Sequence, residues 1–288
     1  MNVKIAAAQY DISFLETWAN YQRKSERWVR EAAEQGAKIL LFPEYNTMEL
    51  ASLFSETVYS SLNLSLIEMQ IVHEAFLNLF QGLAQQYQCV IQAGSFPVLI
   101  SEDVYHNRAY LFMPNGETHF QDKMMMTRFE NEQWLISAGD ELKTFDTEFG
   151  RIAINICYDS EFPLLARKQV EMGANLILVP SCTDTVAGFH RVKIGCQARA
   201  LENQCYVVQA ALVGDAPWSP AVDVNVGAAG IYTPVDYGFP DNGILANGEF
   251  NKPQWIFAEI DLQNCEKVRA EGQVFNYRDW SRQIGILI

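Results

Sequence analysis

Short apolar runs alternate with longer segments in which apolar residues recur at helical spacing. Val3–Gln9 is a compact apolar run and predicts a strand. Thr17–Gln35 carries apolar residues on one face of a predicted helix, which ends before Gly36. Lys38–Phe42 is again a short apolar run, closed by Pro43, and predicts a second strand. The chain therefore begins with a strand, a helix and a strand.

The alternation continues to the end of the sequence. Ser65 and Glu68 have the spacing of a capping box and predict the start of a helix that runs to Leu83. Further strands are predicted at Cys89–Phe96, Arg108–Met113, His119–Gln121, Lys143–Phe145, Arg151–Ile156, Asn175–Val179, Cys205–Leu212 and Trp255–Ile260. Further helices are predicted at Glu161–Met172 and Ala187–Asn203. Gly214–Asn251 is rich in Gly, Pro, Asn and Asp and predicts loops. We therefore expect one α/β layered domain over residues 1–288, with strands buried on both faces.

Composition and charge narrow the classes of function. The chain has 288 residues, of which 49% are hydrophobic, so it can form a large core. Its 21 Lys and Arg against 35 Asp and Glu give a net charge of −14, which argues against a nucleic-acid partner. No apolar stretch approaches the roughly 20 residues needed to span a bilayer. Because no signal segment is visible either, we expect a soluble, cytoplasmic protein without membrane association.

Neither the cysteines nor the histidines have the spacing of a metal site. Six cysteines and four histidines are scattered without a CxxC or CxxH pair. We therefore predict no metal, and most of the cysteines are expected to be buried free thiols.

Cys157 has the most distinctive local setting. The apolar run that begins at Arg151 ends on Cys157, and the predicted helix at Glu161–Met172 begins a few residues later. A thiol at such a turn lies near helix N-terminal N–H groups, which favour the thiolate, and is exposed to substrate. The alternative is a buried structural cysteine, which is the usual place for this residue type.

Two further ionisable residues follow predicted strands. Glu44 comes just after Lys38–Phe42, where loss of water raises the pKa of a carboxyl toward that of a useful base. Lys123 follows His119–Gln121 and precedes three methionines. Each taken alone also fits a surface residue. Because ligands of α/β sheets bind at the carboxyl ends of the strands, Glu44, Lys123 and Cys157 together predict one acyl-transfer site.

The segments around these residues resemble a known family, the nitrilase-like carbon–nitrogen hydrolases, which use a Glu-Lys-Cys catalytic set. The matching segments are Val3–Gln9, Phe42–Glu44, Asn107–Phe112, Pro114–Gly116, Asp122–Lys123, Gly150–Asp159, Gly173–Ser181 and Arg199–Asn203. Their order and separation carry the resemblance over most of the chain. Glu132 lies in a segment similar to the one that carries the family's second, substrate-positioning glutamate, with Glu130 nearby.

The resemblance implies a four-layer αββα sandwich, no cofactor and a small amide as substrate. Glu44 would act as the base, Cys157 as the nucleophile, and Lys123 with the Tyr158 N–H as the oxyanion-stabilising groups. Glu132 would orient substrate and water. The family's pairing of subunits implies a homodimer or higher homo-oligomer, and we expect the apolar C-terminal tail, about residues 272–288, to lie at its interface.

The sequence departs from the family at positions that bear on the substrate. Met124–Met126 and Ser137-Ala138 stand where relatives often have His and Pro, and Glu161 stands where many have an arginine that binds a carboxylate. Glu161 therefore either contacts a cationic substrate or only interacts with the helix dipole. A nitrilase, an N-carbamoyl-amine hydrolase and a non-catalytic binding protein remain alternatives to an amidase.

Overall fold

The computed structural model describes residues 2–284. Its strands are β1 (Asn2–Asp11), β2 (Ile39–Phe42), β3 (Val90–Ser101), β4 (Val104–Phe112), β5 (Thr118–Asp122), β6 (Ile136–Ser137), β7 (Phe145–Thr147), β8 (Gly150–Ile154), β9 (Leu176–Ser181), β10 (Tyr206–Asp215), β11 (Val224–Asn225), β12 (Gly230–Tyr232), β13 (Ile244–Asn247) and β14 (Gln254–Asp261). Its α-helices are α1 (Trp18–Glu34), α2 (Glu56–Tyr59), α3 (Leu62–Met69), α4 (His73–Tyr87), α5 (Pro163–Glu171), α6 (Val186–Asn203), α7 (Gln263–Glu271) and α8 (Asn276–Ile284). Shorter helical turns span Asn46–Leu53, Gln70–Val72, Glu130–Trp134 and Cys157–Glu161.

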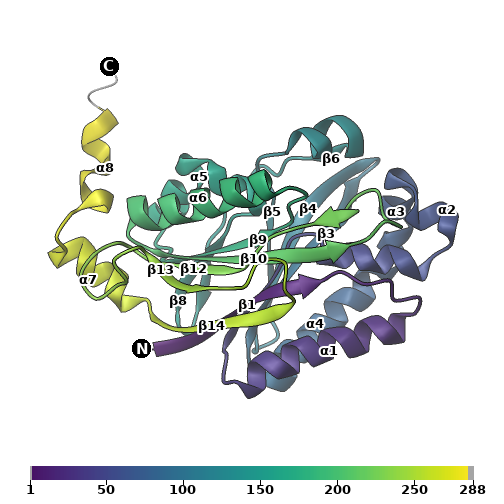
Figure 1. Ribbon diagram of the computed structural model, residues 1–288, viewed down its shortest axis with the longest axis horizontal. Coiled ribbons are helices and arrows are strands. Elements are labelled where there is room, and N and C mark those ends of the chain that lie inside the picture. The colour runs from purple at the N-terminus through teal and green to yellow at the C-terminus, as the bar shows by residue number, and fades with distance from the viewer. Residues whose placement is uncertain (1, 285–288) are drawn as a thin grey trace.

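The strands form one sheet whose order places helices on both outer faces. The path runs β5-β4-β3-β2-β1-β10-β9-β8-β7. In Figure 1, α5 and α6 lie on one side of the strands, and α1 and α4 lie on the other. On β1, Ala6 and Ala8 pack in a core with α1 and α4, whereas Ile5 and Ala7 belong to the core that includes α5 and α6. The predicted α/β sandwich with doubly buried strands is confirmed.

The predicted first helix is confirmed, and its start has a clear cause. The Thr17 hydroxyl accepts a hydrogen bond from the Asn20 N–H at 3.2 Å, which caps α1. The apolar face of the helix, including Trp28 and Val29, is buried. The amphipathic spacing was therefore sufficient to place this element.

The predicted capping role of Ser65 is wrong. Two helices, α3 and α4, occupy the region, and the residue that caps α3 is Ser61, whose hydroxyl accepts from the Leu64 N–H at 3.2 Å. Ser65 lies within α3 and donates its hydroxyl hydrogen to the Leu62 carbonyl at 3.0 Å. Its side chain is thus satisfied inside the helix and does not cap one.

The region Gly214–Asn251 is only partly the loop that the composition predicts. It contains β12, which pairs with β10, and β13, which pairs with β12. These strands have three and four residues, too few for their apolar pattern to stand out among Gly, Pro, Asn and Asp. Their pairing holds the segment against the sheet.

The C-terminal segment forms helices that the sequence did not predict. α8 extends away from the main body at the end of the chain (Figure 1). The Arg167 guanidinium of α5 lies over two of its rings, 4.5 Å from the Tyr277 centroid and 5.2 Å from the Trp280 centroid. Of the predicted tail, residues 285–288 lie outside the described residues.

The carboxyl ends of several strands meet at one edge of the sheet. β2 is parallel to β1 and β3, and β8 and β9 are parallel to each other and, through β10, to β1. β5 is antiparallel to β4, which is antiparallel to β3, so β5 shares their direction. This edge is where the sequence places the candidate residues. Of the helices between residues 2 and 284, none combines the length and the hydropathy that a membrane span requires.

Candidate active site

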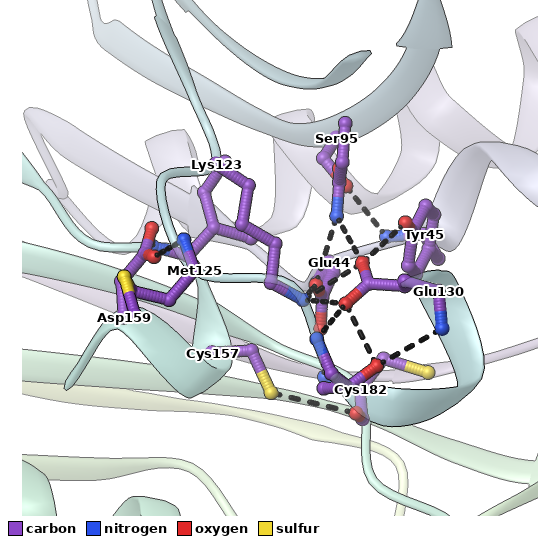
Figure 2. A network of polar contacts seen from close by, with 12 residues as sticks. Glu44, Tyr45, Ser95, Lys123, Met125, Glu130, Cys157, Asp159 and Cys182 are labelled. Atoms are coloured by element: carbon purple, nitrogen blue, oxygen red, sulfur yellow. Dashed lines mark hydrogen bonds and ion pairs between the residues drawn. The ribbon is translucent and has the colours of Figure 1, made fainter. Parts of the chain in front are cut away.

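Glu44, Lys123 and Cys157 lie together in one buried site. Glu44 follows β2, Lys123 follows β5, and Cys157 follows β8. The Lys123 ammonium donates to Glu44 Oε1 at 2.7 Å, and all three residues are at most 4% exposed. Figure 2 shows the three side chains converging on one space. The predicted meeting of these strand ends is therefore observed.

Cys157 lies at a strained turn between strand and helix. Its φ of 49° is in the left-handed region, which a residue with a side chain rarely adopts. The helical turn Cys157–Glu161 starts here, and the Ser160 hydroxyl donates to the Cys157 carbonyl at 2.7 Å. Such strain is characteristic of functional sites, where surrounding contacts hold the conformation. The turn places the thiol in the cavity, with Sγ 3.5 Å from the Cys182 carbonyl oxygen.

The second glutamate of the site is Glu130, and the predicted position of Glu132 is wrong. Glu130 accepts from the Lys123 ammonium at 2.8 and 2.7 Å and from the Tyr45 hydroxyl at 2.6 Å. The Glu132 side chain is 51% exposed and pairs with Arg128 at 2.8 Å. Residues two apart on a helical turn point in different directions, so only one of the two glutamates can face the site.

The sequence contains a signal that distinguishes Glu130 from Glu132 as the residue that faces the site. The π-helical turn Glu130–Trp134 buries its first and last residues. Trp134 is four residues after Glu130, and a tryptophan has the larger tendency to be buried. If Trp134 is taken to face the protein interior, Glu130 faces the interior with it and Glu132 does not.

One lysine and two carboxylates share this site, and their surroundings separate the two carboxyl pKa values. Burial raises the pKa of Glu44, and the attraction of Lys123 offsets this only in part. Burial also tends to raise the pKa of Glu130, but the attraction of Lys123 and the hydrogen bonds that Glu130 accepts together outweigh this effect, so the pKa of Glu130 is lowered. Burial alone would lower the pKa of Lys123, yet Glu130 and Glu44 raise it well above its ordinary value. Glu130 therefore remains ionised beside the ammonium, whereas Glu44 is the carboxyl suited to exchange a proton.

The Cys157 thiol holds its proton at neutral pH. Burial and the nearby Glu44 carboxylate raise the pKa of Cys157 well above its ordinary value. Lys123 opposes that shift without reversing it. A neutral thiol beside a raised-pKa carboxylate is the pairing that general-base activation requires.

Several groups that hold Glu44 were not assigned roles from the sequence. The Asn107 side-chain amide donates to Glu44 Oε1 at 2.9 Å and to Glu130 Oε1 at 3.3 Å. The Cys182 backbone N–H donates to Glu44 Oε2 at 3.1 Å. Cys182 directly follows β9, so its position at the same sheet edge was open to prediction. Together these donors fix both oxygens of the proposed base.

Asp159 joins the chain segments that carry Lys123 and Cys157. Its carboxylate accepts the N–H groups of Met124 at 3.1 Å, Met125 at 2.8 Å and Ile156 at 3.0 Å. Burial raises the pKa of Asp159 from its ordinary 3.8 to about 7. Asp159 thus ties the segment that follows Lys123 to the segment that precedes Cys157.

We expect Asp159→Asn to weaken both the fold and catalysis. The amide NH₂ would face backbone N–H donors and leave at least one of them unpaired, which costs about 1–3 kcal/mol of unfolding free energy. Misplacement of Lys123 against Cys157 should reduce kcat roughly tenfold to 10²-fold. Urea unfolding and steady-state kinetics measure these effects. Unchanged values for both would contradict the role of Asp159.

The pH dependence provides a second check on Asp159. The folded carboxyl, with its pKa of about 7, binds a proton more tightly than the unfolded one. This group therefore adds to wild-type stability as the pH falls through 7 toward 4, and asparagine does not titrate. The stability difference between wild type and Asp159→Asn should be larger at about pH 6 than at about pH 8.

The two predicted substrate-binding residues have different outcomes. Tyr158 directly follows Cys157, and its ring packs edge-on against Phe162 at a centroid distance of 4.8 Å. The role of its N–H stays a prediction. The predicted place of Glu161 in the pocket wall is wrong, because its carboxylate pairs with Arg191 at 3.4 Å and Arg191 lines the cavity instead.

The cavity over Cys157 has a volume of about 480 Å³. This volume suits a small molecule. Its wall comprises Glu44, Tyr45, Lys123, Thr127, Arg128, Phe129, Glu130, Gln133, Trp134, Cys157, Cys182, Asp184, Arg191, Pro220, Ala221, Val222, Asp223 and Val224. Across residues 2–284, no group of three or more His, Cys, Asp or Glu side chains is placed to hold a metal ion.

Comparisons with known proteins find the same family that the sequence resembles. The sequence profile of the family described as carbon-nitrogen hydrolase matches residues 4–270. A Bacillus subtilis protein described as "Probable hydrolase YhcX" is 35% identical over 98% of this chain and 54% of its own length. The chain thus spans about half of that relative.

Two further comparisons cover nearly whole proteins. The human omega-amidase NIT2 is 28% identical over 87% of this chain and 86% of its own. The crystal structure of Saccharomyces cerevisiae Nit3, a member of the nitrilase superfamily, superposes with a TM-score of 0.73 at 22% identity, covering 93% of each chain. At that identity the superposition shows the fold alone.

Proposed function

The chain belongs to the carbon–nitrogen hydrolase family, and on this premise we propose that it is an amidase that converts a small linear amide to an acid and ammonia. The observation that carries the proposal is the buried Lys123 ammonium between Glu44 and Glu130, beside the Cys157 thiol. This set provides a nucleophile, a base and a cation for an oxyanion. Human NIT2 and related proteins that resemble the chain are named as amidases.

In the first half of the proposed reaction, Cys157 is acylated. Glu44 accepts the thiol proton as Sγ attacks the amide carbonyl carbon, and the carbonyl electrons move onto oxygen. Lys123 and the Tyr158 N–H stabilise this oxyanion. Glu44 then returns the proton to the amide nitrogen, the C–N bond breaks, and ammonia leaves a thioester on Cys157.

In the second half, water hydrolyses the thioester. Glu44 accepts a proton from water while the oxygen attacks the thioester carbon, and the same donors stabilise the second oxyanion. The C–S bond then breaks, and Cys157 regains a proton. Glu130 stays ionised throughout, so it holds Lys123 and its hydrogen-bond partners in place.

The same thiolate chemistry also suits an N-carbamoyl amine or a nitrile. These alternatives differ only in the carbon that Cys157 attacks. A non-catalytic binding protein is disfavoured because it would have no need for a strained thiol beside a raised-pKa carboxyl.

An ammonia-release screen tests the proposal. It compares small amides, amino-amides, N-carbamoyl amines and nitriles, with Cys157→Ala as the blank. The expected result is Cys157-dependent ammonia release from at least one small amide. Release from nitriles or carbamoyl compounds alone would favour the corresponding alternative, and labelling of Cys157 by iodoacetamide without any turnover would favour a binding protein that retains a reactive thiol.

We propose that the enzyme works in the cytoplasm. All six cysteines lie within residues 2–284 and are free thiols. A reducing compartment suits a catalytic thiol that must remain unoxidised.

We also propose a homodimer in which the C-terminal tail, about residues 272–288, lies at the interface. Val274 in this segment is 47% exposed, and α8 extends from the main body. Multi-angle light scattering should give twice the chain mass of 32.7 kDa, and removal of residues 276–288 should shift the protein toward the monomer. A monomer at micromolar concentration for the full chain would contradict the dimer.

A further inference from the structure

The cavity wall contains a positively charged side chain, Arg191, whose ion-pair partner does not line the cavity. Arg191 of α6 lines the cavity with Cys157, whereas Glu161 does not. Arg191 Nε lies 3.4 Å from Glu161 Oε1. The Glu161 side chain is only 21% exposed, against 61% for Arg191. The more buried carboxylate therefore anchors the guanidinium.

This anchoring leaves the end of the arginine available. Glu161 is paired with Nε, and no hydrogen bond to Nη1 or Nη2 of Arg191 is found in the part of the chain that the structure describes. A guanidinium presents a planar set of N–H donors that matches the two oxygens of a carboxylate. An arginine held by one acid thus offers its remaining donors to a second acid in the cavity.

The other charged groups of the wall are less well placed for this role. Arg128 also lines the cavity, but its side chain is 84% exposed and its partner Glu132 is 51% exposed. Asp184 and Asp223 line the wall as well, both on exposed positions, and Asp223 accepts the Val224 N–H at 3.0 Å. An ammonium group on the substrate would favour these aspartates. Arg191 has the more buried anchor, and pre-ordered groups lose less entropy on binding.

We propose that Arg191 is a specificity-determining residue that binds a carboxylate on the amide substrate, and that Glu161 is the positioning residue that holds its guanidinium toward the cavity. This assignment rests on the proposed amidase function and narrows its substrate to an amide with a second, anionic end. Glu161 taken alone predicts a cationic substrate. This assignment predicts an anionic substrate instead, because the carboxylate of Glu161 is paired with Arg191, which lines the cavity.

Three amides of similar size test the proposal: succinamate with a carboxylate, butanamide without charge, and β-alaninamide with an ammonium group. The wild type should have its highest kcat/KM with succinamate. In Arg191→Gln, the ratio of kcat/KM for succinamate to that for butanamide should fall about tenfold to a hundredfold, mainly through KM. The matched control is Lys193→Gln on the same helix, because Lys193 Nζ faces Asn247 Oδ1 at 3.3 Å. The control should keep the wild-type ratio.

A charge swap separates substrate binding from a structural role. The double variant with Glu161→Arg and Arg191→Glu retains an ion pair but places a carboxylate on the cavity wall. It should favour β-alaninamide over succinamate. An unchanged order of the three amides in the swap would overturn the proposal, as would a wild-type preference for β-alaninamide that Arg191→Gln leaves intact.

Binding to an inactive variant distinguishes this proposal from the amidase function itself. Calorimetry should detect succinamate binding to Cys157→Ala and about tenfold or more weaker binding when Arg191→Gln is added. If the wild type hydrolyses butanamide but succinamate binding ignores Arg191, only the Arg191 assignment fails. If no amide is hydrolysed but succinamate binding depends on Arg191, the amidase function fails and the anion site stands.

Discussion

Replacing Cys157 with serine is expected to reduce amide hydrolysis by roughly 10⁴-fold or more, close to the level of Cys157→Ala. The reason lies in the surroundings of the thiol. Cys157 is buried, burial and the nearby Glu44 carboxylate raise its pKa, and Glu44 is the proposed acceptor of its proton. A serine hydroxyl is far less acidic than a thiol, so a carboxylate is too weak a base to activate it. Steady-state ammonia release measures the loss.

The control for this substitution is another buried cysteine. Cys89 is 1% exposed, and its thiol contacts the Ala37 carbonyl at 3.1 Å, away from the cavity wall. Cys89→Ser should alter stability and leave kcat close to the wild-type value. Mass spectrometry of rapidly quenched enzyme should find an acyl group on Cys157 of the wild type and none on Cys157→Ala. Near-wild-type activity in Cys157→Ser would rule out the thioester mechanism.

The strand ends were predictable because their causes are local. Short apolar runs place Glu44 and Cys157 after β2 and β8, and parallel strands must bring these ends to one edge. Lys123 followed from the same reasoning, although its strand is only five residues long. Glu44, Lys123 and Cys157 were therefore identifiable as neighbours without knowledge of the packing.

What was not predicted depended on direction within turns. Glu130 and Glu132 differ by two positions in a five-residue π-helical turn, which is too short for apolar periodicity to show which side chain faces inward, so the choice depends on reading the large side chain of Trp134 as buried. Glu161 failed for a different reason. Its partner Arg191 is 30 positions away on α6, and nothing in the local sequence shows that their charges meet.

The matched substitutions Glu130→Gln and Glu132→Gln test the corrected register directly. Glu130 is 2% exposed and accepts two hydrogen bonds from the Lys123 ammonium, one from the Tyr45 hydroxyl and others from Thr127. A glutamine amide can accept at one atom only, so its NH₂ would face these donors. We expect kcat to fall roughly 10²–10³-fold for Glu130→Gln, because Lys123 would lose its fixed position at the oxyanion.

The matched control is expected to have little effect, because Glu132 is half exposed and a surface ion pair contributes at most about 1 kcal/mol. Glu132→Gln should therefore keep kcat within about twofold of the wild type. Urea unfolding of both variants separates misfolding from a loss confined to catalysis. A large loss of kcat in Glu132→Gln, with Glu130→Gln active, would mean that the turn carries the opposite register in solution. We expect the larger loss of kcat for Glu130→Gln because Glu130 is the buried one of the two. Since Glu130 has no water around it, it depends on Lys123 to remain ionised, and of the two glutamates it alone can hold the Lys123 ammonium in place.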